Sequence, residues 1–257
     1  MPRIDVDGLS IRYRHHAATR PDAPSLLLLH MAGSSSVAWS ATANRIGDSV
    51  EVLIPDLPGH GQSAGEPLTS IAAMAHFAQR FLDAHGLRRV HVGGHSMGGA
   101  VALQLTLSAP ARVRSLLLVS TSARLSVAPV VFELIDKKFD QMPALFAGQA
   151  AGTSPVSQAL PGVEPIFPQT SQEGVRRDFA ACAQSDLRDR LGEITCPAAV
   201  VVGRDDQLTP PRWSEHLAAG IAGASLHIEQ GSGHLLPREK PALVAGIARE
   251  LLQRASP

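Results

Sequence analysis

Only two cysteines, Cys182 and Cys196, occur in 257 residues, too few for a disulfide framework and without the spacing of a metal site. We therefore expect reduced thiols and a cytoplasmic protein. Lysine is scarce, and 23 basic residues balance 23 acidic ones, so no basic tract is available for nucleic acid. No apolar run reaches the ~18 residues that a membrane span needs, and no signal peptide is visible at the start. With 44% hydrophobic residues and no net charge, the chain is expected to fold rather than remain disordered.

Short apolar runs alternate with helical stretches through most of the chain. The runs suit strands buried on both faces of a parallel sheet and lie at residues 25–29, 51–54, 90–93, 113–120, 198–202 and 225–228. Helices are predicted at residues 37–46, 71–85, 98–109, 213–222 and 241–253. Asp7-Gly8 indicates an opening hairpin. The order predicts an α/β fold, a mostly parallel doubly wound sheet with flanking helices.

Residues 124–192 break this alternation. Prolines separate short helical pieces there, at positions 129, 143, 155, 161, 165 and 168. Phenylalanine gathers in the same segment, at positions 132, 139, 146, 167 and 179. These rings are expected either as the core of a helical insertion or as the lining of a pocket under a lid, and the two interpretations are compatible.

The sharpest motif is Gly-x-Ser-x-Gly at Gly94, Ser96 and Gly98, between a β-branched strand and an alanine-rich helix. In that context the motif indicates a nucleophile elbow, in which the serine sits on a sharp turn. A side chain two positions before or after the serine would not fit this turn. The following helix would present its free N–H groups to a developing oxyanion. Ser96 is therefore the predicted nucleophile.

A serine hydroxyl needs a base, and the base needs an orienting acid. Among 11 histidines, His234 is favoured because it lies in a glycine-rich loop directly after the last predicted strand. Catalytic groups in doubly wound sheets gather at that edge. Asp205 and Asp206, after an earlier strand, are both candidates for the acid. The chain order serine, aspartate, histidine is that of α/β-hydrolases.

The sequence resembles the α/β-hydrolase superfamily over nearly its whole length. The resemblance rests on the elbow and on four further stretches, at residues 29–34, 56–63, 203–206 and 233–237. It implies an acid at Asp206 rather than Asp205, because the family places this acid four residues before a proline. It also implies a core at residues 1–123 and 193–257, with residues 124–192 as a helical lid inserted after the sixth strand.

The same resemblance implies that the backbone N–H groups of Ala32 and Met97 form the oxyanion hole. The chain departs from the family at Met31, where relatives usually have a glycine after the histidine. Glycine alone visits positive φ freely, so this change bears on the conformation of the loop. Members similar to enol-lactonases also lack that glycine.

The expected activity is hydrolysis of a small carboxylic ester or lactone through an acyl-enzyme, without a metal or organic cofactor. Cofactor-free perhydrolysis, as in haloperoxidase-like members, would use the same triad. Carbon–carbon bond hydrolysis ranks lower, because those relatives usually have asparagine where His95 stands. A ligand receptor that kept the fold is the alternative from another class. No nucleic-acid or membrane partner is expected, and the oligomeric state is not predicted.

Overall fold

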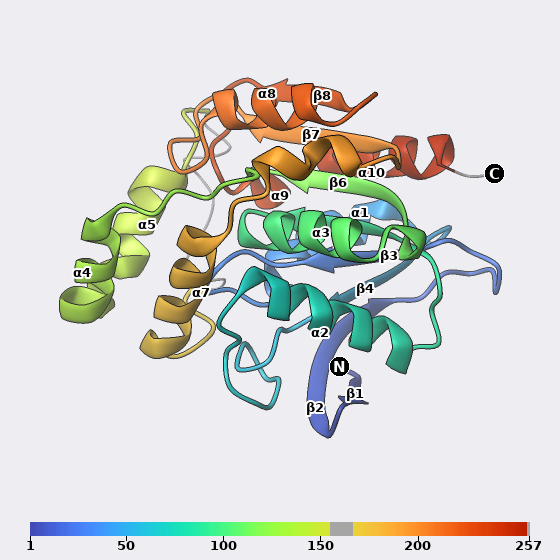
Figure 1. Cartoon of the computed structure of the whole chain (residues 1–257), viewed down its shortest axis with the longest axis horizontal. Helices are drawn as coiled ribbons and strands as arrows, with labels where there is room; N and C mark the ends of the chain where they lie inside the picture. The colour runs from blue at the N-terminus through green and yellow to red at the C-terminus, as the bar shows by residue number, and fades with distance from the viewer. Residues whose placement is uncertain (155–166, 256–257) are drawn as a thin grey trace.

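One sheet of eight strands organises the protein. It is seen in a computed structural model that describes residues 1–154 and 167–255. The strand order is β1-β2-β4-β3-β5-β6-β7-β8 (Figure 1). The strands are β1 (Arg3–Val6), β2 (Leu9–His16), β3 (Ser25–Leu29), β4 (Glu51–Pro55), β5 (Val90–His95), β6 (Val113–Val119), β7 (Ala198–Gly203) and β8 (Ser225–Glu229).

The sheet is mostly parallel. β1 pairs with β2, and β2 with β4, in antiparallel register, whereas every pairing from β4 onward to β8 is parallel. Every residue of β5 and β7 is buried, as expected for central strands covered on both faces. The predicted mostly parallel doubly wound sheet is confirmed.

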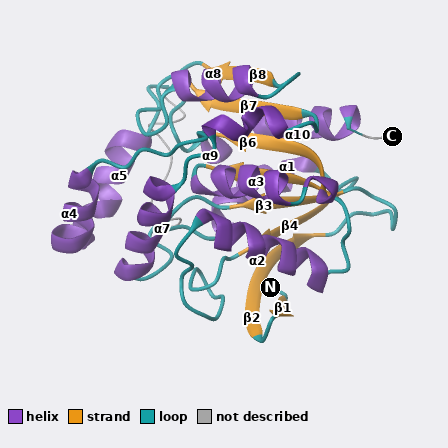
Figure 2. Ribbon diagram, in the orientation of Figure 1, coloured by secondary structure: helices purple, strands orange, loops and turns teal. Residues whose placement is uncertain are grey.

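Helices cover both faces of the sheet (Figure 2). One face packs against α2 (Ile71–Ala84), α3 (Met97–Ser108) and α8 (Pro211–Gly220) in the larger hydrophobic cluster. The other packs against α1 (Ser40–Ile46) and α10 (Pro241–Arg254). The short helix α9 (Leu236–Glu239) links β8 to α10. Sequence sets these boundaries locally: at the start of α2, for example, the Ser70 hydroxyl accepts the Ala73 N–H.

A helical insertion follows β6, as the sequence predicts. It contains α4 (Pro129–Lys138), α5 (Met142–Ala150) and α7 (Gln172–Gln184), and we call this insertion the cap. The three helices stand together at one end of the sheet in Figure 1. Pro155, Pro161 and Pro165, predicted to interrupt the cap, lie outside the described residues. Its limits at residues 124 and 192 stay a prediction.

Among the described residues, no helix is both long enough and apolar enough to cross a bilayer. Cys182 and Cys196 are both free thiols.

Candidate active site

Ser96 occupies a strained turn between β5 and α3. Its φ is +54° and its ψ is −119°, a conformation that L residues rarely adopt. Three backbone hydrogen bonds hold the turn. The Ser96 N–H donates to Val119 O at 3.0 Å, and the Ser96 carbonyl oxygen accepts the N–H groups of Gly99 at 2.9 Å and Ala100 at 3.3 Å. Such strain persists where the surrounding structure enforces it, and it is frequent at functional sites.

The glycines flanking Ser96 are steric requirements. A Cβ at Gly94 would lie 2.0 Å from the carbonyl oxygen of Gly98, and a Cβ at Gly98 would lie 2.2 Å from that of Leu29. Backbone from β3, β5 and α3 thus meets at distances that leave no room for a methyl group. This close approach brings the amino end of α3, which begins at Met97, next to the loop after β3.

His234 and Asp206 form a buried pair at the carboxyl edge of the sheet. His234 Nδ1 lies 2.9 Å from Asp206 Oδ2 and 3.1 Å from Oδ1, and both side chains are almost fully buried. An ionised carboxylate only accepts, so Nδ1 carries the proton and Nε2 is free to accept one. Of the two consecutive aspartates, it is therefore Asp206 that reaches the imidazole.

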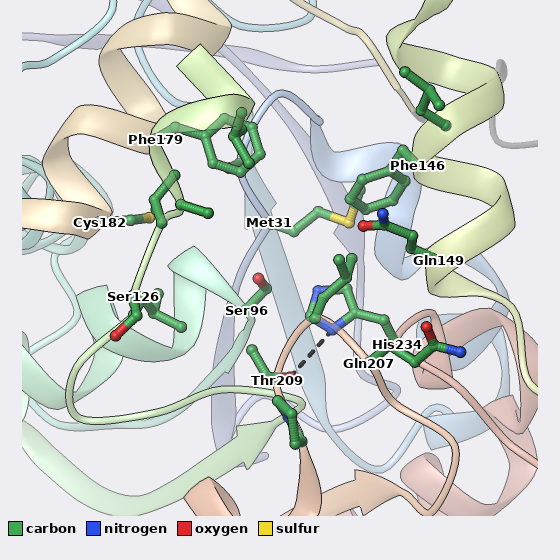
Figure 3. Close-up of a pocket in the computed structure, with 18 of the residues that line it drawn as sticks. Met31, Ser96, Ser126, Phe146, Gln149, Phe179, Cys182, Gln207, Thr209 and His234 are labelled. Atoms are coloured by element: carbon green, nitrogen blue, oxygen red, sulfur yellow. Dashed lines mark hydrogen bonds between the residues drawn. The ribbon is translucent and has the colours of Figure 1, made fainter. Parts of the chain in front are cut away.

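Thr209 belongs to this arrangement, although no sequence motif identifies it. Its hydroxyl donates to Asp206 Oδ2 at 2.7 Å and lies 3.2 Å from His234 Nδ1, a contact drawn in Figure 3. The backbone N–H groups of Leu208 and Thr209 donate to Asp206 Oδ1. Burial alone would raise the pKa of Asp206, but the His234 charge and these hydrogen bonds outweigh it and lower that pKa. Asp206 therefore stays ionised at neutral pH.

Asp205 contacts the cap instead. Its Oδ2 accepts from the Thr153 N–H at 3.0 Å and from the Thr153 hydroxyl at 2.6 Å, while its own N–H donates to Ser232 O. The two aspartates therefore have different partners, Thr153 for Asp205 and His234 for Asp206.

His95, directly before Ser96, supports the backbone of His234. Its Nε2–H donates to the His234 carbonyl oxygen at 2.8 Å, and the two rings lie 5.0 Å apart. Burial, with help from the charge on His234, lowers the pKa of His95 to about 3. His95 is therefore neutral at neutral pH. The His234 N–H donates to Ala150 O in the cap at 2.7 Å, so both backbone groups of His234 are held.

The loop after β3 contains Met31 and Ala32, and Met31 does not strain it. Among the described non-glycine residues, positive φ occurs only at Asp7, Ser96 and Ser120. The left-handed conformation falls two positions later than the family's glycine, on Gly33, with φ of +68°. Met31 and Ala32 both line the pocket described next, together with Ser96.

A cavity of about 430 Å³ lies over Ser96 and His234, between the sheet edge and the cap (Figure 3). Its walls are mostly apolar, and the cap contributes many of them, including Val131, Leu134, Met142, Leu145, Phe146 and Phe179. Gln149 and Gln207 are among its few polar side chains and lie near His234 in the view of Figure 3. The cap thus forms much of the surface that a substrate would meet.

In residues 1–154 and 167–255, no group of three or more His, Cys, Asp or Glu side chains is arranged to hold a metal ion. The polar groups that line the pocket include the Ser96 hydroxyl and the His234 imidazole.

Three solved structures are similar to the chain over nearly its full length. A hydrolase from Pseudomonas aeruginosa PA01 is 30% identical, with a TM-score of 0.84, over 97% of this chain and 96% of that one. A thermophilic esterase from Thermogutta terrifontis is 25% identical, with a TM-score of 0.84, over 99% and 98%. The enol-lactonase from Burkholderia xenovorans LB400 shares the fold at 24% identity, with a TM-score of 0.87, over 98% and 100%.

The sequence profile described as "Alpha/beta hydrolase family" matches residues 26–247. This match spans most of the chain and includes the elbow, both candidate acids and the His234 loop. The strand order, the insertion after β6 and the sequence match agree, so the chain belongs to the α/β hydrolase family, and esterases are among the solved structures similar to it.

Proposed function

We propose that the protein is a serine hydrolase that cleaves a carboxylic ester or lactone through an acyl-enzyme on Ser96. The observation that carries this proposal is the buried Asp206–His234 hydrogen bond, 2.9 Å long, because its histidine lines the same pocket as Ser96. A protonated Nδ1 facing a carboxylate leaves Nε2 as a base, which is what a serine nucleophile requires. The esterase and lactonase relatives support the same class of reaction.

In the first half-reaction, Ser96 Oγ attacks the carbonyl carbon while His234 Nε2 takes the hydroxyl proton. The Ala32 and Met97 N–H groups donate to the resulting oxyanion. Asp206 keeps the imidazole in one tautomer and stabilises its positive charge. When the tetrahedral intermediate collapses, the bond between the former carbonyl carbon and the alkoxy oxygen of the ester breaks, and His234 gives its proton to the departing alkoxide.

In the second half-reaction, a water molecule attacks the acyl carbon and gives a proton to His234. The second intermediate expels Ser96 Oγ, which recovers its proton, and the carboxylic acid leaves. These steps need neither a metal nor an organic cofactor. In this proposal residues 1–123 and 193–257 carry the reaction, and residues 124–192 set the substrate range.

The apolar lining of the pocket supports an uncharged, largely apolar acyl group as the part of the substrate that enters it. The test is a panel of p-nitrophenyl esters and lactones, assayed with purified protein and with Ser96→Ala. A fluorophosphonate probe, which reacts only with an activated serine, provides an independent readout. Ser96-dependent turnover and labelling support the proposal, whereas folded protein that neither turns over nor labels favours the ligand receptor.

Perhydrolysis and carbon–carbon bond cleavage are separated by adding two substrates to the panel. Peracid formation from hydrogen peroxide and acetate, if faster than ester hydrolysis, would identify the perhydrolase instead. Cleavage of a vinylogous 1,5-diketone without ester hydrolysis would identify the carbon–carbon bond hydrolase.

A further inference from the structure

The cap holds the backbone of Gly33 on both sides. The Gly33 N–H donates to Asp178 Oδ2 at 2.7 Å, and the Gly33 carbonyl oxygen accepts from the Gln169 N–H at 2.7 Å. Asp178 lies in α7, and Gln169 just precedes that helix, whereas Gly33 follows β3 in the core. A Cβ at Gly33 would lie 2.4 Å from the Phe167 ring, so only glycine permits this approach. Cap residues therefore fix the position directly after Ala32.

Asp178 also binds His60, from the loop after β4. His60 Nε2 lies 2.8 Å from Asp178 Oδ2, and His60 Nδ1 lies 3.0 Å from the carbonyl oxygen of Pro58. A carbonyl oxygen cannot donate, so Nδ1 carries a proton, and the facing carboxylate places a second one on Nε2. Below its raised pKa, His60 is therefore an imidazolium. With Asp178 it forms a fully buried ion pair.

The neighbouring His30 differs in charge. Its Nδ1–H donates to the Met31 carbonyl oxygen at 2.8 Å, and its Nε2 accepts the Leu57 N–H at 3.1 Å, so it is neutral. Burial, together with the charge on His60, lowers the pKa of His30 to about 4. Burial would lower the pKa of His60 too, but the charge of Asp178 and the hydrogen bonds to it outweigh burial and raise that pKa.

We propose that Asp178 is a positioning residue for the reaction, with His60 as its partner. Through Gly33 it holds in place the loop after β3, residues 31–36, which contains Ala32 and which we call the oxyanion loop. The oxyanion hole would then be set by the cap as well as by the core. This inference rests on the proposed function, because it assigns the Ala32 N–H to the oxyanion. It adds a residue that neither the motifs nor the pocket lining identifies.

The hydrogen bond from Gly33 to Asp178 can fix the position of the Ala32 N–H. Ala32 and Gly33 are adjacent, so a displaced Gly33 N–H moves the donor that precedes it. Hydrogen bonds to an ionised carboxylate are about twice as strong as neutral ones, and the buried position of Asp178 removes competition from water. A misplacement of about 1 Å costs on the order of 10²-fold in rate. Asp178 can therefore alter kcat without touching the substrate.

The ion pair also implies a pH dependence. The charged and titratable groups around His60 and Asp178 are His30 after β3, Asp56 after β4 with Arg12 on β2, and Cys182 on α7. Because the pKa of His60 lies above its ordinary value of 6.5, the pair is complete below 6.5 and is lost as pH rises through that raised pKa. We expect kcat to fall on the alkaline side as the oxyanion loop loosens.

If Asp178 only fastens the cap, its removal will lower stability and raise KM without changing kcat at saturation. Asp178→Asn keeps the shape and an oxygen for Gly33, but it gives His60 no charge. We predict a fall in kcat for p-nitrophenyl acetate of about 10- to 100-fold, with KM changed less than about threefold. The matched control is Arg176→Gln on the same helix. It removes an exposed ion pair with Asp136 and a cation–π contact with the Phe132 ring, and it should leave kcat within about twofold of wild type.

His60→Gln provides a second route if Asp178→Asn does not fold. The glutamine side chain can still donate to Asp178 but cannot be charged. We therefore expect a lower kcat, and we expect the alkaline limb, the fall in kcat at high pH that this pair causes, to be absent. A folded Asp178→Asn with wild-type kcat, or a His60→Gln with an unchanged alkaline limb, would overturn the inference.

Amide hydrogen exchange keeps this test separate from the proposed function. If the wild type neither hydrolyses esters nor labels at Ser96, the proposed function fails. Exchange across residues 31–36 still decides the coupling of cap and loop. Faster exchange in Asp178→Asn than in Arg176→Gln supports that coupling, and equal exchange in the two variants overturns it.

Discussion

Asp205 and Asp206 are consecutive, yet their carboxylates bind different parts of the molecule. Asp206 contacts the imidazole of His234 at 2.9 Å, whereas Asp205 accepts the Thr153 hydroxyl in the cap at 2.6 Å. One aspartate can thus orient the proposed base while the next fastens the cap above it. The two side chains provide a natural matched pair of substitutions.

We predict that Asp206→Asn lowers kcat by roughly 10³- to 10⁴-fold, because an amide favours the wrong tautomer of His234. Asp205→Asn should cost at most about tenfold, since Thr153 can still donate to the amide oxygen. Steady-state kinetics on one activated ester measures both values. A larger loss in Asp205→Asn than in Asp206→Asn would contradict the assignment of the acid.

The cap side chains should control which acyl groups are accepted. Leu134 lines the pocket from α4, so Leu134→Ala would lengthen the cavity without altering Ser96 or His234. We predict that the ratio of kcat/KM for p-nitrophenyl hexanoate to that for the acetate rises about 5- to 10-fold, within the range that one or two methylenes contribute.

Leu226→Ala is the control for that change, because Leu226 is an exposed leucine on β8 and does not line the pocket. It should leave the hexanoate-to-acetate ratio at its wild-type value. Equal ratios in the wild type and in Leu134→Ala would mean that this wall of the cavity does not meet the acyl chain.

The buried, neutral His95 should make the free energy of unfolding depend on pH. Its pKa is lowered to about 3 by burial, whereas in the unfolded chain it takes up a proton near 6.5. The unfolded state therefore binds more protons below pH 6.5, and stability falls as pH falls from there toward 3. His95 contributes up to about 1.4 kcal/mol per pH unit to that slope.

His95→Gln removes this titration while keeping a donor for the His234 carbonyl oxygen. Urea denaturation at pH 7 and pH 5 gives the free energy of unfolding of each protein. The pH 7 to 5 loss should be smaller in the variant than in the wild type. Identical losses would show that His95 does not carry this part of the pH dependence.

Much of the fold followed from local patterns. Parallel strands, the hairpin at Asp7 and the elbow at Ser96 have signals within about ten residues, and each lies where the sequence predicted it. The pairing of Asp206 rather than Asp205 with His234 was predicted through the spacing of a family motif. Ala32 and Met97 as oxyanion donors, and the cytoplasmic location, stay predictions.

Other features depend on contacts between distant segments, and the sequence carried no sign of them. Asp178 and His60 are 118 residues apart, and nothing around either residue indicates a buried ion pair. Thr209 belongs to no sequence motif, and the sequence singles out His95 only as a departure from one branch of the family. Tertiary packing alone assigns partners to such side chains.

Rapid mixing with p-nitrophenyl acetate, followed by mass spectrometry of the quenched protein, tests for an acyl-enzyme on Ser96. We predict a burst approaching one equivalent of p-nitrophenol whenever deacylation is slower than acylation, and a covalent acetyl group on the peptide that contains Ser96. Ser96→Ala should be folded and show neither, with turnover reduced on the order of 10⁴-fold or more. Turnover in Ser96→Ala above a tenth of the wild-type rate, or acetylation at another residue, would contradict this prediction.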